Sequence, residues 1–274
     1  MIIELLPLFI TLLVAGALAG ITAGLFGNGG GFVVVPALVF VFSILADPTS
    51  DLIFVAIGTS LATIVISSAR SVIAHSAKGA VDFNVVKSWA PWLLLGVGAG
   101  LYLASFARPN QLYSVFAGGV LIYSVYFLFP KALSNMSFSD TMPTGVTRAS
   151  IASVLGGFSA LLGIGGGTPT VITMVACSRP IYQAVATASG VGFIIGLGGA
   201  IGFLILGFGK ADLPVGSIGY INMPALLAMG ITSLFTAPIG VKWAHSVDEN
   251  VLKRMFGIYL VVVSLSMFWK ASQI

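Results

Sequence analysis

Two glycine clusters have the spacing in this sequence that best suits a binding site. They are residues 27–31 (Gly-Asn-Gly-Gly-Gly) and residues 163–167 (Gly-Ile-Gly-Gly-Gly), and Thr168 and Pro169 follow the second. Glycine breaks a helix and lets backbone N–H groups turn outward. Thr168 suits an N-cap and Pro169 suits the first helical position, so we expect a helix to begin at residue 168 and, by symmetry, near residue 32. The N-terminus of such a helix has unpaired N–H groups and a positive dipole end, which together favour an anion.

The same glycines have a second interpretation, in which they only let helices pack closely. Each cluster is longer than a packing motif needs and it occurs twice, which favours the binding-site interpretation. Interrupted segments at matching places in two halves of a membrane protein are the best sequence indication of a transporter site. A P-loop is excluded because no Gly-Lys-Ser/Thr follows either cluster.

A second group of polar residues shares one helical face of the apolar segment 52–77. Its members are three or four residues apart: Thr59, Thr63, Ser67 and Arg70. An arginine inside a membrane is costly and usually functional, so Arg70 can be the counter-charge for an anion. Alternatively, Arg70 extends to the membrane surface and the hydroxyls bond to their own backbone. The matching region of the second half offers Thr187 and Ser189 and has no arginine.

The sequence contains no motif that would indicate a metal site, a cofactor or an enzymatic activity. No cluster of His, Asp, Glu and Cys has metal-ligand spacing, so we expect neither a metal site nor a cofactor. No nucleophile elbow and no paired carboxylates are present, so we expect no enzymatic activity. The single cysteine, Cys177, rules out an internal disulfide.

The composition determines what kind of fold must position these residues. The chain has 274 residues, of which 58% are hydrophobic and 7% are charged. Soluble domains carry about 25% charged residues, and the mean hydropathy of +1.08 is far too high for one. The net charge of +4 does not indicate nucleic acid, because Lys and Arg collect in the cytoplasmic loops of membrane proteins. The sequence predicts an all-α polytopic membrane protein.

Ten apolar runs follow one another along the chain. They are residues 5–27, 32–46, 52–77, 88–106, 111–129, 146–163, 168–177, 181–208, 218–244 and 250–269. A full crossing takes about 20 residues. Residues 32–46 and 168–177 are shorter, and each follows a glycine cluster, so we expect two half-helices that either cross or re-enter.

The two halves of the chain resemble each other. A shift of 136 residues places the first glycine cluster on the second, and a shift of 140 pairs residues 100–124 with 240–264. Between these blocks, residues 78–82 resemble 209–212. We therefore predict a first repeat at 1–130, a linker at 131–145 and a second repeat at 146–274. Five segments per repeat is an odd number, so the second copy should be inverted in the membrane.

The charged residues orient this arrangement. The side that holds both termini has three cations: Arg108, Lys210 and Lys270. The other side has eight: Lys78, Lys87, Lys131, Arg148, Arg179, Lys242, Lys253 and Arg254. Because Lys and Arg mark the cytoplasmic side, we predict that the linker is inside and that both termini are outside.

One family shares this pattern of motifs. The run Gly20 to Gly31, followed by apolar residues and Pro36, and its repetition at residues 163–169 resemble the TauE/SafE sulfite exporter family over nearly the whole chain. The resemblance implies a multi-pass protein of the bacterial inner membrane that is linked to sulfite, sulfonates or other small anions. Asn28 departs from the family pattern, in which an apolar residue such as Ile164 is commoner, and it can add a polar donor.

These observations combine into one expectation: a transporter that moves a small anion, such as sulfite or an organosulfonate, by alternating access. The anion would lie between the two half-helix N-termini. The predicted substrate-binding residues are Asn28, Gly29, Gly30, Gly31, Thr59, Ser67, Arg70, Gly165, Gly166, Gly167, Thr168, Thr187 and Ser189. The partners are then the anion and the lipid bilayer, without nucleic acid, and a homo-oligomer is compatible with this picture. A non-transporting scaffold or assembly subunit, and a cation or metal carrier, stay open as alternatives.

Overall fold

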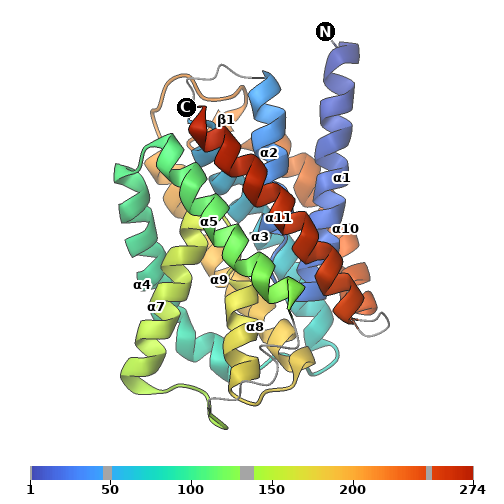
Figure 1. Cartoon of the computed structure of the whole chain (residues 1–274), viewed down its shortest axis with the longest axis vertical. Helices are drawn as coiled ribbons and strands as arrows, with labels where there is room; N and C mark the ends of the chain where they lie inside the picture. The colour runs from blue at the N-terminus through green and yellow to red at the C-terminus, as the bar shows by residue number, and fades with distance from the viewer. Residues whose placement is uncertain (1, 46–50, 130–138, 245–248, 274) are drawn as a thin grey trace.

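The computed structural model describes residues 2–45, 51–129, 139–244 and 249–273, and these form a bundle of helices with one short hairpin (Figure 1). The elements are α1 (Ile2–Phe26), α2 (Gly31–Leu45), α3 (Leu52–Ser76), α4 (Phe83–Phe106), α5 (Pro109–Leu128), α7 (Gly145–Leu162), α8 (Gly167–Ala176), α9 (Ile181–Leu206), β1 (Ser217–Ile218), β2 (Ile221–Asn222), α10 (Met223–Trp243) and α11 (Glu249–Ser272). Eight of the described helices are long and apolar enough to cross a membrane. The prediction of an all-α polytopic membrane protein is confirmed.

Two helices, α2 and α8, are too short to cross a membrane. They have 15 and 10 residues, or about 22 and 15 Å at 1.5 Å per residue, against a hydrocarbon core of about 30 Å. Each runs back toward the end of the bundle from which the preceding long helix came (Figure 1). The predicted half-helices after the glycine clusters are therefore present, as returns of α1 and α7.

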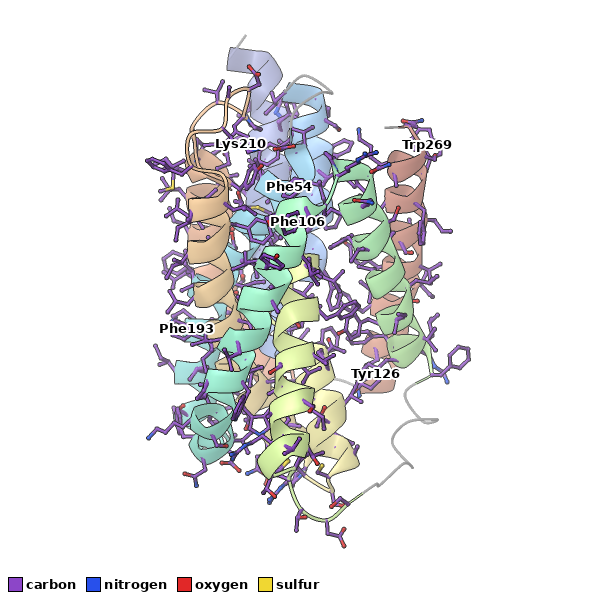
Figure 2. The ribbon with its side chains drawn as sticks, turned by 90° about the vertical axis from the view of Figure 1, so that its left-hand side faces the viewer. Phe54, Phe106, Tyr126, Phe193, Lys210 and Trp269 are labelled. Carbon is purple, nitrogen blue, oxygen red and sulfur yellow. The ribbon has the colours of Figure 1, made fainter. Side chains whose placement is uncertain are left out.

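Both ends of the chain lie at one end of the bundle, which we call the terminus end. The linker between α5 and α7 meets the opposite end, which we call the linker end (Figure 1). Lys210 and Trp269 mark the terminus end, and Tyr126 lies toward the linker end (Figure 2). Most of the predicted linker, residues 130–138, lies outside the described residues.

The helices pack in matched pairs drawn from the two halves. Helix α1 lies along α10 and α7 lies along α4, while α3 packs on α9 and α5 on α11. Small residues bring the backbones together at equivalent points: Gly20 lies against Ser233, and Gly156 lies against Leu93. Helices α1 and α7 also begin at opposite ends of the bundle (Figure 1). This is the arrangement that an inverted duplication requires; the duplication and its boundaries stay predictions.

A short β-hairpin covers the terminus end of the two central helices. The apolar run 218–244 predicted one uninterrupted segment there, but α10 begins only at Met223, because Gly216 and Gly219 adopt positive φ and turn the chain into β1 and β2. Tyr220 at its tip stacks on Phe54 at 5.1 Å and donates a hydrogen bond of 2.5 Å to Asp51. Burial, then the contact with Asp51, raises the pKa of Tyr220, so its phenol stays a donor at neutral pH.

Candidate functional site

The two glycine clusters form tight loops between helices. Gly166, with φ +64°, is the N-cap of α8, and Gly30 has φ +84°; both values lie in the left-handed region that glycine tolerates best. The predicted helix start at residue 168 with Thr168 as N-cap is therefore wrong. Helix α8 begins at Gly167, and the Thr168 hydroxyl, inside the first turn, has no hydrogen-bond partner.

The two loops lie directly against each other. A Cβ placed on Gly31 would collide with the Gly163 carbonyl oxygen, and one placed on Gly167 would collide with the Gly27 carbonyl oxygen. The space between the two half-helix N-termini, where we expected the anion, is therefore filled by loop backbone in this structure. These glycines serve close packing, which was the alternative interpretation, and they also bring two helix N-termini to one place.

The central helix α3 supports both loops at its midpoint. Ile64, in the middle of α3, lies against Gly29 and Gly165. One turn to each side, Ser60 donates a hydrogen bond of 2.7 Å to the Gly163 carbonyl, and Ser67 donates one of 2.9 Å to the Gly29 carbonyl. Ser67 therefore holds a loop in place, and its proton is not available to a substrate as we had expected.

Asn28 is the polar residue of the first loop, and half of its amide has no partner. Its Oδ1 accepts a hydrogen bond of 3.0 Å from the Gly30 N–H. An N–H can bond only to the oxygen, so this contact fixes the orientation of the amide. The Nδ2 group is buried with no hydrogen-bond partner, and the residue is 1% exposed. Asn28 is thus a buried residue whose Nδ2 donor has no acceptor among the described protein groups.

Three further buried hydroxyls without partners lie near the loops. Ser68 is 3.0 Å from the position that a Cβ on Gly192 would take, and Gly192 lies beside the Gly165 carbonyl. Ser159 lies beside Gly166 in the same way, at 3.1 Å. Thr168 completes the group. Buried polar groups are nearly always paired, so these unpaired hydroxyls beside the loops make the loop crossing a candidate binding place.

The remaining predicted site residues lie away from this crossing. Thr59 accepts a hydrogen bond of 2.8 Å from the N–H of Asn222, the N-cap of α10. Thr187 accepts one of 2.9 Å from the N–H of Asp82, the N-cap of α4. These two threonines therefore hold helix starts. Because each threonine bonds to the N-cap of a helix, the two contacts match Asp82 with Asn222. The sequence comparison had instead aligned residues 78–82 with residues 209–212. The hairpin lies between residues 212 and 222, and it displaced that alignment.

Ser189 and Arg70 also have local partners. Ser189 donates to the Val185 carbonyl one turn earlier on α9, at 3.2 Å. The Arg70 Nε donates to the Leu234 carbonyl on α10, at 3.5 Å. The structure therefore gathers Asn28, the glycines and Thr168 at one place, with Ser67 as a support, and it does not bring Arg70 to them.

Sequence reasoning missed Ser60, Ser68 and Ser159 as site residues. The first two flank the polar face of α3 that contains Thr59 and Ser67, so a wider face would have included them. Ser159 gave no such indication, because it lies in an apolar helix four residues before its glycine loop. Among the described residues, no group of three or more His, Cys, Asp or Glu side chains could hold a metal ion.

Comparison with known proteins extends over nearly the whole chain. The family model for the sulfite exporter TauE/SafE matches residues 12–267. A probable membrane transporter protein of Haemophilus influenzae is 35% identical over 264 residues, which cover 94% of this chain and 97% of the relative. Probable membrane transporter proteins of Methanocaldococcus jannaschii and Bacillus subtilis are 27% and 26% identical, and each alignment covers 96% of this chain and 97% or 98% of the relative. No solved structure matches the chain.

Proposed function

The chain belongs to the TauE/SafE sulfite exporter family, and from that premise we propose that it carries a small oxyanion, such as sulfite or an organosulfonate, across the membrane. Family membership and the names of the relatives support membrane transport and give no support to an enzymatic activity. The eight crossing helices make it a multi-pass membrane protein. The substrate and the mechanism of alternating access are our inferences from the site.

The unpaired Nδ2 donor of Asn28 is the observation that carries the proposal. A buried donor without a partner costs about 1–3 kcal/mol, and an oxygen of the substrate would recover that cost. The first N–H groups of α2 and α8 add donors, because the opening turn of a helix has no internal partners for them. A site made of neutral donors at two helix N-termini suits an anion.

The loop carbonyls argue against a cation as the substrate. A cation carrier needs backbone oxygens that are free to coordinate the ion. The carbonyls of Gly29 and Gly163 instead accept hydrogen bonds from Ser67 and Ser60. The Asn28 Nδ2 donor has no partner, whereas these two loop carbonyls already accept hydrogen bonds. The site therefore favours a ligand that accepts hydrogen bonds.

The contact between the loops supports the proposal of alternating access. Since the two loops touch, an anion can enter only when the halves of the molecule move apart at one end. The hydrogen bond from Tyr220 to Asp51 joins the hairpin to the start of α3 at the terminus end. We therefore propose that this structure represents a state in which the two loops are in contact and the substrate is absent from between them.

A binding assay on purified protein tests the proposal. We expect sulfite, thiosulfate, sulfate, sulfoacetate or taurine to raise the melting temperature of the wild type, and we expect Asn28→Leu to lose that response. Gly98→Ala is a matched control, because Gly98 faces open space on α4. Liposomes with the wild type should then accumulate the same anion. If no anion binds or moves, the scaffold alternative stands; if Na⁺ or Mg²⁺ stabilises the protein without an anion, the cation alternative stands.

Labelling from outside the cell tests the proposed orientation in a bacterial inner membrane. In a Cys177→Ala background, a cysteine at Gln273 should react with an impermeant thiol reagent, while a cysteine at Thr144 should react only after the cells are opened. Both positions are exposed. The opposite pattern would reverse the orientation and leave the fold unchanged.

A further inference from the structure

One face of the central helix α3 changes from apolar to polar where it passes the loop crossing. Residues three or four positions apart lie in one row along a helix, and this row consists of Ile57, Leu61, Ile64, Ser68, Ser71 and His75. Helix α3 begins at the terminus end, where Asp51 meets the hairpin, and Ile64 at its midpoint lies against both loops. The row is therefore apolar on the terminus side of the crossing, at Ile57 and Leu61, and polar on the linker side.

Two serines of the polar part have buried hydroxyls without a hydrogen-bond partner. Ser68 and Ser71 are both 0% exposed. A serine in a helix commonly bonds to a carbonyl one turn earlier, as Ser189 does on α9, yet neither hydroxyl makes such a bond. Ser68 lies beside Gly192 at the level of the crossing, and Ser71 follows one turn closer to the linker end. Two donors are thus available in succession, from the loop crossing toward the linker end.

The two short helices show the same difference. Each begins with the last glycine of its cluster, and the residue that follows is Phe32 in α2 and Thr168 in α8. Helix α2 runs from the crossing toward the terminus end, and α8 runs toward the linker end (Figure 1). Phe32 is buried against the rings of Tyr123 and Phe256, whereas Thr168 is 2% exposed and its hydroxyl has no partner. Unpaired donors therefore lie on the linker side of the crossing on two separate elements.

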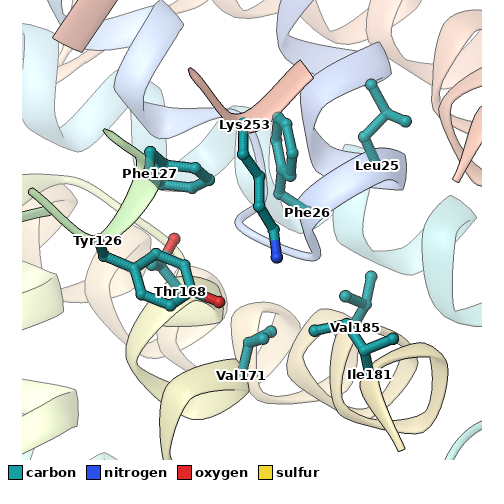
Figure 3. Close-up of a pocket in the computed structure, with 9 residues that line it drawn as sticks. All are labelled: Leu25, Phe26, Tyr126, Phe127, Thr168, Val171, Ile181, Val185 and Lys253. Carbon is teal, nitrogen blue, oxygen red and sulfur yellow. The ribbon is translucent and has the colours of Figure 1, made fainter. Parts of the chain in front are cut away.

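A small pocket lies on this same side of the crossing, and Figure 3 shows it beside the start of α8. Its volume is about 20 Å³, enough for about one water molecule. Thr168 lines it, together with residues of both halves such as Phe26 and Val185. The pocket is too small for an oxyanion, so an anion can pass here only after the two halves separate.

We propose that Ser68 and Ser71 line the path by which the anion passes between the loop crossing and the linker end. This inference rests on the proposed transport of an anion. An anion that leaves the crossing loses the donors of Asn28 and of the helix N-termini, and hydroxyls along its way replace part of its hydration. On the terminus side the same row presents Ile57 and Leu61, which have no polar side-chain atoms, so the anion reaches that end along other residues.

Cysteine labelling tests where this path lies. In a Cys177→Ala background, Ser71→Cys should react with an impermeant thiol reagent from the same side of the membrane as Thr144→Cys, which marks the linker end. Ile57→Cys is the matched control, because Ile57 is as many residues before Ile64 as Ser71 is after it. We expect Ile57→Cys to stay unreactive from the linker side.

Two outcomes of the labelling would overturn the inference. One is a cysteine at Ser71 that stays unreactive in opened cells or reacts from the side of Gln273→Cys. The other is equal reactivity of Ile57→Cys and Ser71→Cys from the linker side. The labelling needs no substrate, so its result stands even if the wild type moves no anion, which is how failure of the proposed function would appear.

Uptake into liposomes tests the role of the hydroxyl itself. We expect Ser71→Ala to slow the uptake of sulfoacetate about tenfold, because passage loses one hydrogen bond to a charged group. Its affinity for sulfoacetate should stay within about twofold of the wild type, because Asn28 is unchanged. Its melting temperature should not fall, because the removed hydroxyl has no partner to lose.

Ser124→Ala is the matched control for uptake. Ser124 is also buried, but its hydroxyl bonds to the Leu121 carbonyl within α5, so this variant should transport normally. Equal uptake by Ser71→Ala and the wild type would remove the Ser71 hydroxyl from the path.

Discussion

The two glycine loops share a backbone plan and differ in their polar residues. In each, the first residue of the short helix packs on a glycine carbonyl of the other loop, Gly31 on Gly163 and Gly167 on Gly27. The first loop carries Asn28, with its unpaired donor, at the position where the second carries the buried Ile164. The second loop has its unpaired polar group one residue after the glycines, in Thr168. Packing is therefore common to both loops, and hydrogen-bonding capacity is distributed unequally between them.

The central helices differ in the same way. Ser60 and Ser67 of α3 each bond to a glycine carbonyl, one in each loop. At the corresponding places α9 presents Ala188 against Gly27 and Ile195 against Gly166. Helix α3 thus anchors both loops by side-chain hydrogen bonds, whereas the α9 side chains that face the loops at these places are apolar. This difference ties both loops to α3 more firmly than the α9 side chains do.

Loss of the loop-to-loop contact should have the largest effect. Gly167→Ala or Gly31→Ala places a methyl group against backbone atoms of the other loop, which cannot move aside as a side chain can. Overpacking of this kind costs about 1–3 kcal/mol or more, and we expect anion transport in liposomes to fall to background. Because the contact is reciprocal, both variants should fail equally.

The control for this pair is Gly98→Ala, which should transport normally and gain about 1 kcal/mol of helix stability. Normal transport by Gly167→Ala would show that the two loops do not need each other.

An exchange of the differing residues should have the next largest effect. Asn28→Ile removes the only polar side chain of the first loop, and we expect anion affinity to drop about 10- to 100-fold through the lost bond to a charged ligand. The exchanged double variant, Asn28→Ile with Ile164→Asn, should not recover this loss, because an amide at position 164 lies in different surroundings. Titration of a bound anion measures both. Full recovery in the double variant would make the two loops interchangeable.

Removal of the α3 anchors should destabilise the fold to a moderate degree. Ser60→Ala and Ser67→Ala each leave one buried loop carbonyl without its donor. We expect each to lower the free energy of unfolding by about 1–3 kcal/mol. Thermal melting in detergent measures the change, and Ser105→Ala, which alters an exposed bond within one helix, should leave stability unchanged. A larger loss from Ser105→Ala than from Ser60→Ala would refute the anchoring role of α3.

Arg70 should give the smallest effect. It is half-buried, and its Nε contacts the Leu234 carbonyl at 3.5 Å, away from both loops. A contact of this length contributes no more than about 0.5 kcal/mol, so Arg70→Gln should keep its anion affinity within about twofold. An affinity loss above about tenfold would place Arg70 in the site after all and add a further difference between α3 and α9.

The sequence was a good guide to the helices and to the position of the loops. Long apolar runs predicted the crossing helices because a chain in lipid must satisfy its own backbone hydrogen bonds, and a helix does so within one segment. The glycine clusters predicted two interruptions because glycine best tolerates the left-handed backbone found at Gly30 and Gly166. Both are properties of local composition, which a single sequence displays directly.

The partners of individual side chains could not be predicted in the same way. Thr168 is a good N-cap by type, but the left-handed conformation of Gly166 starts the helix one residue earlier. Arg70 and Ser67 lie on one face of α3, yet one contacts α10 and the other the first loop. The hairpin that contains Tyr220 could not be predicted, because part of it lies within the apolar run 218–244. Each of these depends on which helices become neighbours, and residue spacing within one helix does not contain that information.

The reciprocal contact between the loops also constrains how the protein is made. The first half of the chain enters the membrane before the second half has been synthesised. Until then its glycine loop lies at membrane depth without the backbone groups of Gly163 and Gly167 against which it packs, and hydrocarbon offers no substitute for them. The half-inserted chain is therefore an unstable biosynthetic intermediate that the insertion machinery must shield. Under the proposed function, a truncated product would contain only one of the two loops and would therefore have no complete site through which anions could leak.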